Sequence, residues 1–288
     1  MKRIKALQKY YHCLIAGLPD IFLDETELSF SLQDFKEELE NELYSEDYKL
    51  AMTLFLPYDN KNLLNFLQEK YNEFDKLGNF NSETLERELN PEERLHVLPA
   101  YMYSFTDWYK ENKGDKSIKE WENILTRQYF DYMLNSSNQF LRDWYTFELN
   151  VTNILTGINC RKFDRDPERE IIGNNFVTEA IKRSSAKDFG LEVELEYAGD
   201  VIQIAEKENL LTREKNLDQF KWNKLNELTL FNYFSIEVVL AYILKLEMIY
   251  RWMSLDENTG RKMFEKLIDE LKDSFEFSKE FIINEQRR

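Results

Sequence analysis

Histidines and carboxylates are the side chains of this sequence that offer the chemistry most enzymes use. Nucleophilic triads and most proton shuttles rely on histidine, and the chain holds only His12 and His96. His12 lies in the aromatic run Tyr10–His12 and fits a packed or surface role better than a catalytic one. Glu93 and His96 have the Glu-x-x-His spacing of di-iron bundles, but such sites need a second copy of this motif. The sequence lacks that copy, so we expect no metal site.

Cofactor-binding motifs are also missing from the sequence. It contains neither a G-x-x-x-x-G-K-[ST] phosphate loop nor a G-x-G-x-x-G dinucleotide fingerprint. Cys13 and Cys160 do not have the paired spacing of a zinc site, and we expect both to be reduced thiols in the cytoplasm. We therefore expect a non-catalytic protein with no catalytic residue, no cofactor and no metal.

Two carboxylates, Glu148 and Glu247, stand out because each falls within an apolar helical stripe. A buried carboxylate is costly unless it is paired or hydrogen-bonded. One interpretation is a catalytic acid. The other is a structural carboxylate that ties neighbouring helices together through a backbone or arginine partner. We favour the structural interpretation, which predicts that both side chains are largely buried and hydrogen-bonded.

The elements that must position these residues are helices. Folds rich in strands need many tight turns, whereas the 288 residues include only 8 glycines and 5 prolines. Hydrophobic residues make up 43% of the chain, which is ample for a substantial core. We predict an all-α fold, in which only residues 10–18 and 190–197 resemble strands.

Capping signals mark where several of these helices begin. Ser31 precedes an acidic first turn, and Ser117 opens a full capping box. Asn90–Pro91 and Asp166–Pro167 each place a capping residue before a proline at the first helical position.

Three further helices follow from the apolar pattern. A stripe from Phe140 to Leu155 predicts a helix that ends at Gly157, a plausible C-cap. Ser235 precedes a long helix that reaches Leu255. Thr259 precedes a last helix, whose apolar residues face inward; these are Phe264, Leu267, Ile268 and Leu271.

Charge narrows the choice of partners. The net charge is −16, whereas neutralising phosphates requires a basic face, so we expect no nucleic-acid partner. The longest apolar stretch, residues 236–255, contains four charged residues, which makes it a poor membrane span. We therefore expect no direct insertion into a membrane.

A faint internal repeat runs through the chain. The segment from Tyr58 to Leu64 aligns with that from Leu149 to Leu155, so that Asn62-Leu63 matches Asn153-Ile154. A weaker third copy at residues 246–250 pairs Glu247 with Glu148. Chance similarity between amphipathic helices is the alternative explanation.

Two stretches resemble known families. Residues 9–20, followed by residues 31–35, resemble the opening of an uncharacterised bacterial family associated with V-type ATP synthases. Residues 235–247, which include Tyr242 and Lys245, are similar to the C-terminal helix of the C/d-type subunit family of V/A-type ATPases. The Asn-Leu pairs of the internal repeat resemble the Asn-Leu-Arg element of that family, with leucine in place of the arginine.

This resemblance implies a single, funnel-like, all-helical unit over residues 1–288. Its three related lobes would cover approximately residues 1–110, 111–185 and 186–288. It would be a non-catalytic cytoplasmic subunit, peripheral to the membrane, that couples the central stalk of a V-type ATPase to the membrane ring. Those stalk and ring subunits would be its partners.

A helical enzyme or small-molecule-binding protein, with a carboxylate-lined cavity between lobes, is the alternative. The lining of the cavity should separate the two interpretations. A socket for a shaft should be wide and open, whereas an active site should be enclosed, with converging titratable groups of shifted pKa.

Overall fold

The computed structural model describes residues 10–255 except 26, 113 and 115, and within these every regular element is helical. The predicted all-α fold is confirmed. The helices are α1 (His12–Gly17), α2 (Leu32–Glu42), α3 (Ser45–Met52), η1 (Thr53–Phe55), α4 (Leu56–Leu67), η2 (Tyr71–Glu73), α5 (Ser82–Leu89), α6 (Ala100–Glu111), α7 (Ile118–Leu134), α8 (Gln139–Lys162), α9 (Pro167–Glu170), α10 (Phe176–Arg183), α11 (Ala198–Ala205), α12 (Leu210–Thr229) and α13 (Ile236–Ser254). The two strand-like segments instead form α1 and a series of turns.

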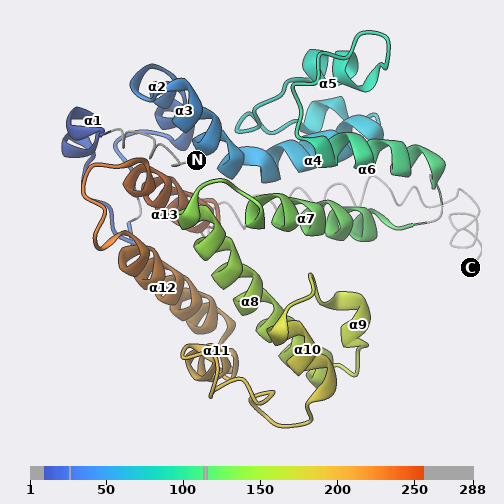
Figure 1. The fold of residues 1–288 in the computed structure, drawn as a ribbon, viewed down its shortest axis with the longest axis vertical. Helices are drawn as coiled ribbons and strands as arrows, with labels where there is room; N and C mark the ends of the chain where they lie inside the picture. Colours follow the sequence, from blue (N-terminus) through green and yellow to red (C-terminus); the bar gives the residue numbers. More distant parts are fainter. Residues whose placement is uncertain (1–9, 26, 113, 115, 256–288) are drawn as a thin grey trace, which may run out of the picture.

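Two groups of helices diverge from a corner between α7 and α8 (Figure 1). In one group α4 and α6 pack on α7, and in the other α10, α11 and α12 pack on α8. Helix α13 packs on α12 as well as on α2 and α3, so it joins the N-terminal helices to the second group. Among the described helices, none has the length and apolar character needed to span a membrane. The division into three related lobes and the funnel shape stay predictions.

Local capping signals located several helix starts correctly. The Ser31 hydroxyl accepts a hydrogen bond from the Asp34 amide at 3.0 Å, and Ser117 forms the same capping box with Glu120. Asp166–Pro167 begins the one-turn helix α9. Ser235 precedes α13, although its hydroxyl donates to Glu237 instead of capping the helix. The helix predicted after Thr259 lies outside the described residues.

Gly157 does not end a helix, contrary to the prediction, because α8 continues to Lys162. A Cβ atom at this position would lie 2.6 Å from Cγ2 of Ile181 in α10 and 3.1 Å from the ring of Phe189. The glycine is therefore needed for close packing against α10. Tertiary packing explains a residue that the local pattern assigned to a helix terminus.

The helix predicted to begin at Asn90–Pro91 is also absent, since residues 91–93 form a turn. The cause is Glu88, a fully buried carboxylate at the end of α5. It accepts hydrogen bonds from the backbone amides of Leu95, at 3.1 Å, and Val97, at 3.2 Å. A helix through this segment would point those amides at its own carbonyl groups, so the carboxylate and the helix compete for the same donors.

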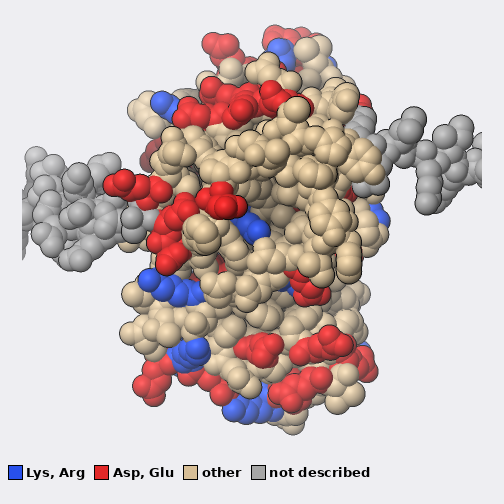
Figure 2. All heavy atoms as spheres, turned by 90° about the vertical axis from the view of Figure 1, so that its left-hand side faces the viewer, with Lys and Arg blue, Asp and Glu red and all other residues tan. Residues whose placement is uncertain are grey.

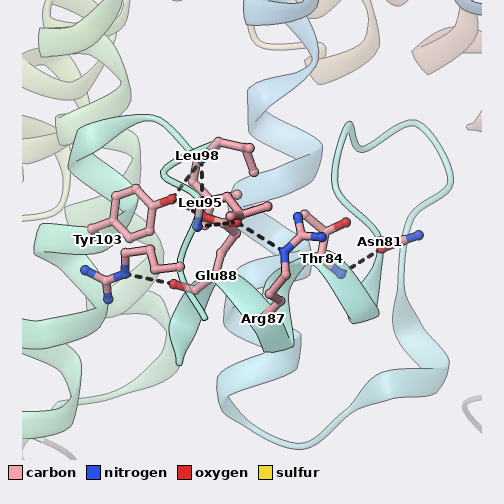
Figure 3. A network of polar contacts seen from close by, with 9 residues as sticks. Asn81, Thr84, Arg87, Glu88, Leu95, Leu98 and Tyr103 are labelled. Atoms are coloured by element: carbon pink, nitrogen blue, oxygen red, sulfur yellow. Dashed lines mark hydrogen bonds and ion pairs between the residues drawn. The ribbon is translucent and has the colours of Figure 1, made fainter. Parts of the chain in front are cut away.

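Further donors complete the network around Glu88 (Figure 3). The hydroxyl of Tyr103 donates to its carboxylate at 2.5 Å, and Arg87 forms an ion pair with it. Burial alone would raise the pKa of Glu88, but the hydrogen bonds outweigh it and lower the pKa from 4.5 to about 2. The ionised carboxylate therefore fixes the connection between α5 and α6.

We expect Glu88→Gln to destabilise the protein by about 2–3 kcal/mol at neutral pH, because hydrogen bonds to a charged acceptor are lost. The depressed pKa means that this stabilisation is complete above pH 4.5 and disappears as the pH falls toward 2. Urea unfolding at pH 7 and pH 3 would measure it. A difference between variant and wild type that does not shrink at pH 3 would contradict this role.

Candidate functional site

Asn62 fixes the loop that follows α4. Its buried side-chain amide pairs with both backbone groups of one residue, Asp75. The Nδ2 group donates to the Asp75 carbonyl at 2.9 Å, and Oδ1 accepts from the Asp75 amide at 2.7 Å. A primary amide offers this adjacent donor and acceptor, which a carboxylate or hydroxyl of the same size does not. We call this arrangement an amide clamp.

Asn153 forms a second amide clamp, in α8. It is fully buried and pairs with the backbone of Ile172, donating to the carbonyl at 2.8 Å and accepting from the amide at 2.9 Å. The next residues of the repeat, Leu63 and Ile154, are both fully buried in the core. The matched asparagines of the predicted repeat therefore make the same contact in two different helices.

The polar residue three positions before each clamp also reaches the following loop. Asp59 accepts hydrogen bonds from the backbone amides of Asn79 and Phe80, at 2.6 and 2.9 Å. Burial raises the pKa of Asp59 to about 7, although these hydrogen bonds oppose the rise. Asn150 accepts from the side chain of Asn175, the N-cap of α10, at 2.9 Å. Both copies thus secure the segment that leads into a short helix.

Tyr242 and Lys245, in α13, make structural contacts. The hydroxyl of Tyr242 donates to the Pro19 carbonyl at 3.1 Å. The ammonium group of Lys245 donates to Asn226 at 2.7 Å and lies over the ring of Trp222, and burial lowers its pKa. These family-motif residues anchor α13 to the N-terminal segment and to α12.

A cavity of about 640 Å³ opens between α4, α7, α8, α12 and α13. It brings together Glu148 and Glu247, the two carboxylates that the sequence singled out. Four aromatic residues form part of its wall; these are Tyr129, Phe130, Trp144 and Tyr145. Its volume falls in the range of small-molecule sites.

Glu148 ties two helices together, as predicted, but its partner is a lysine rather than the predicted arginine or backbone group. Its Oε1 atom lies 2.5 Å from the ammonium group of Lys221 in α12, so the ion pair joins α8 to α12. Its Oε2 atom is buried and has no hydrogen-bond partner among the described residues. The side chain is largely buried, with 21% of its surface exposed, and the unpaired oxygen itself is shielded from solvent.

Glu247 differs from the prediction, because its side chain makes no hydrogen bond or ion pair with another described residue. Burial raises its pKa from 4.5 to about 8. Its charge also raises the pKa of three phenols; these belong to Tyr58, Tyr129 and Tyr145. Glu247 is therefore a half-buried acid of the cavity wall that lacks a counter-charge among the described residues.

Asp218 is a cavity residue that the sequence reasoning missed. It accepts hydrogen bonds from the guanidinium group of Arg251 and, at 2.6 Å, from the indole of Trp252. The signal that could have found it was its position four residues before Trp222 on the buried side of α12. Pairing Glu247 with Glu148 in the weak third copy aligns Trp252 with Asn153. Trp252 bonds to Asp218 and forms no amide clamp.

The cavity combines aromatic surface with titratable side chains. Within the described part of the chain, no three His, Cys, Asp or Glu side chains are grouped closely enough to hold a metal ion. His96, of the Glu-x-x-His segment, lies in a loop against the ring of Tyr103. What the cavity offers is aromatic surface together with carboxylates that have unused acceptor atoms.

We expect Asn153→Leu to destabilise the protein by about 2–4 kcal/mol. The leucine keeps the volume but leaves both backbone groups of Ile172 without partners in the interior. Asn159→Leu, on the exposed side of the same helix, is the matched control and should change stability by less than about 0.5 kcal/mol. Equal stabilities of the two variants in urea unfolding would show that the clamp is not a main support of α8.

Glu247→Gln should stabilise the protein at pH 8 by on the order of 1–2 kcal/mol, because it removes an acid that burial disfavours in its charged form. The raised pKa means that wild-type stability falls as the pH rises from 4.5 to about 8. The variant should lose this slope. Denaturation at pH 5 and pH 8 would test it, and a variant less stable than wild type at both values would indicate a hidden structural partner.

One family model matches residues 7–275. No curated protein and no solved structure matches the chain. Because the matched range covers most of the sequence, the chain belongs to the family described as a protein of unknown function (DUF2764).

Proposed function

We propose that this protein is a non-catalytic subunit of a V-type ATPase or ATP synthase, which couples the central stalk to the membrane ring. The proposal rests on the sequence resemblance of two segments, residues 9–20 and 235–247, to proteins of that machinery. The structure supports it with one observation, which is the way in which these two segments meet.

The two segments are far apart in the chain but lie side by side. The backbone amide of Tyr11 donates to the carbonyl of Phe234 at 2.6 Å, and the rings of His12 and Phe234 are 4.4 Å apart. Tyr242 reaches the Pro19 carbonyl from α13. The first resembling segment therefore contacts the second through Tyr242, and it also contacts Phe234, the residue just before the second segment.

The turn between α12 and α13 presents bare apolar side chains beside this region. Leu230, Phe231 and Tyr233 are 63%, 84% and 72% exposed; we call these three residues the aromatic turn. Figure 2 shows the side of the molecule on which α1 and this turn lie, where a broad area of uncharged residues is bordered by acidic groups and by several basic ones. Apolar patches with polar rims are typical of protein interaction sites.

The acidic charge suits partners with basic contact faces, since the chain carries a net charge of −16. A coupling protein must transmit torque. It therefore needs a pre-formed surface toward each partner, and each interface should bury more than the roughly 1,000 Å² expected of a specific contact. The described helices share one hydrophobic core, which favours a pre-formed surface.

Co-purification from the native cell tests this role. The tagged protein would be recovered from gently solubilised membranes and its companions identified. We expect the ATPase catalytic subunits, stalk and ring. Recovery of the protein alone, beside intact ATPase complexes that lack it, would refute the proposal.

Variants at the aromatic turn make this test specific. Phe231→Asp combined with Tyr233→Asp should abolish recovery of the ATPase subunits without lowering the melting temperature, because both rings are exposed. Phe163→Asp changes another exposed ring, at the end of α8, and is the matched control. Loss of partners in the control alone would place the interface elsewhere.

The central cavity favours a second candidate function, which is small-molecule binding. The cavity is partly open, as expected of a socket, but it also gathers titratable groups, one of which has a strongly raised pKa. The latter feature is typical of ligand sites.

A further inference from the structure

We propose that the cavity between α4, α7, α8, α12 and α13 binds an organic ammonium ion, whose charged group lies between Glu148 and Glu247 and whose apolar body packs on the aromatic wall. This inference names the ligand class of the second candidate function. It does not depend on the coupling role.

The three basic side chains that line the cavity already have acidic partners. Lys221 pairs with Glu148, Arg251 pairs with Asp218, and Lys61 lies 3.9 Å from the carboxylate of Asp75. An anionic ligand would have to compete with these partners. The chemistry that remains unpaired is therefore acidic.

Two acidic side chains that line the cavity have oxygen atoms without a partner among the described residues. In Glu148 this is one oxygen, buried just beneath the cavity surface, and Glu247 makes no hydrogen bond or ion pair at all. They project from different helices, α8 and α13. An ammonium group carries three donors and can satisfy acceptors that converge from two sides.

The aromatic wall explains why an organic cation fits better than a metal ion. The rings of Tyr129, Trp144 and Tyr145 line the same cavity as the two carboxylates. Aromatic faces attract ammonium groups and cover apolar carbon at the same time. A metal ion needs a tighter set of ligands, and the described residues contain no such cluster.

The proposed ligand explains why Glu247 has no partner among the described residues. Because its pKa is raised to about 8, this side chain is protonated at neutral pH without the ligand. The ligand's ammonium group would replace that proton as the counter-charge. A half-buried acid without a partner among the described residues is costly in a purely structural role, but it is useful in a cation-binding site.

Three probes with one indole body separate charge from shape: tryptamine, its neutral analogue tryptophol, and indole-3-acetate. Titration calorimetry with the full-length protein should show tryptamine binding at least tenfold more tightly than the other two. The aliphatic 1,5-diaminopentane is the second cationic probe. Failure of both cationic probes to bind would overturn the inference.

Equal binding of tryptophol and tryptamine would overturn the ammonium inference but support small-molecule binding in the cavity. The two ideas can therefore fail separately. Neither outcome bears on the co-purification test, which concerns a different surface.

Glu247→Gln should weaken tryptamine binding at least tenfold while leaving the melting temperature equal or higher, so lost binding cannot be attributed to unfolding. Glu148→Gln should weaken it as well. Glu227→Gln, an exposed carboxylate of α12 outside the cavity, is the matched control and should bind like wild type. Unchanged affinity in both cavity variants would contradict the proposed site.

Discussion

Polar side chains buried in central helices must find hydrogen-bond partners, and this requirement organises the molecule. Helices α4 and α8 each carry an asparagine whose amide takes both backbone groups of one loop residue. Each also carries a second polar residue that reaches the segment beyond that loop. The loops are therefore tied to the core by side chains rather than by secondary structure. Because α4 and α8 also line the central cavity, the same contacts help to define its walls.

The molecule separates two kinds of unused surface. Inside, where five helices line one cavity, Glu148 and Glu247 have oxygen atoms without partners in the described part of the chain. Outside, the aromatic turn leaves apolar rings exposed beside the contact between His12 of α1 and Phe234, which precedes α13. The first is chemically suited to a cation and the second to a protein surface. They lie on different parts of the fold, so a binding role and a coupling role do not exclude each other.

Local features were predictable from the sequence, and long-range ones were not. The capping boxes at Ser31 and Ser117 depend on residues three positions apart, and both were found. Gly157 and Asn90–Pro91 carried equally clear local signals, but packing against Ile181 and the carboxylate of Glu88 overrode them.

The candidate site followed the same pattern. Repetition in the sequence identified Asn62 and Asn153, and apolar surroundings identified Glu148 and Glu247. Their partners were not predictable, because no local rule links an asparagine to a loop residue more than ten positions away. The convergence of the two acids depends on how α8 and α13 cross, which periodicity alone does not specify.

Hydrogen exchange of individual backbone amides would probe the two amide clamps most directly. The amides of Asp75 and Ile172 lie in loops, yet each donates to a buried asparagine. If the clamps hold α4 and α8 in place, both amides should exchange as slowly as those in the core of α8, because only global unfolding would release them. Exchange as fast as in the exposed loops would show that the clamps open independently and do not support the fold.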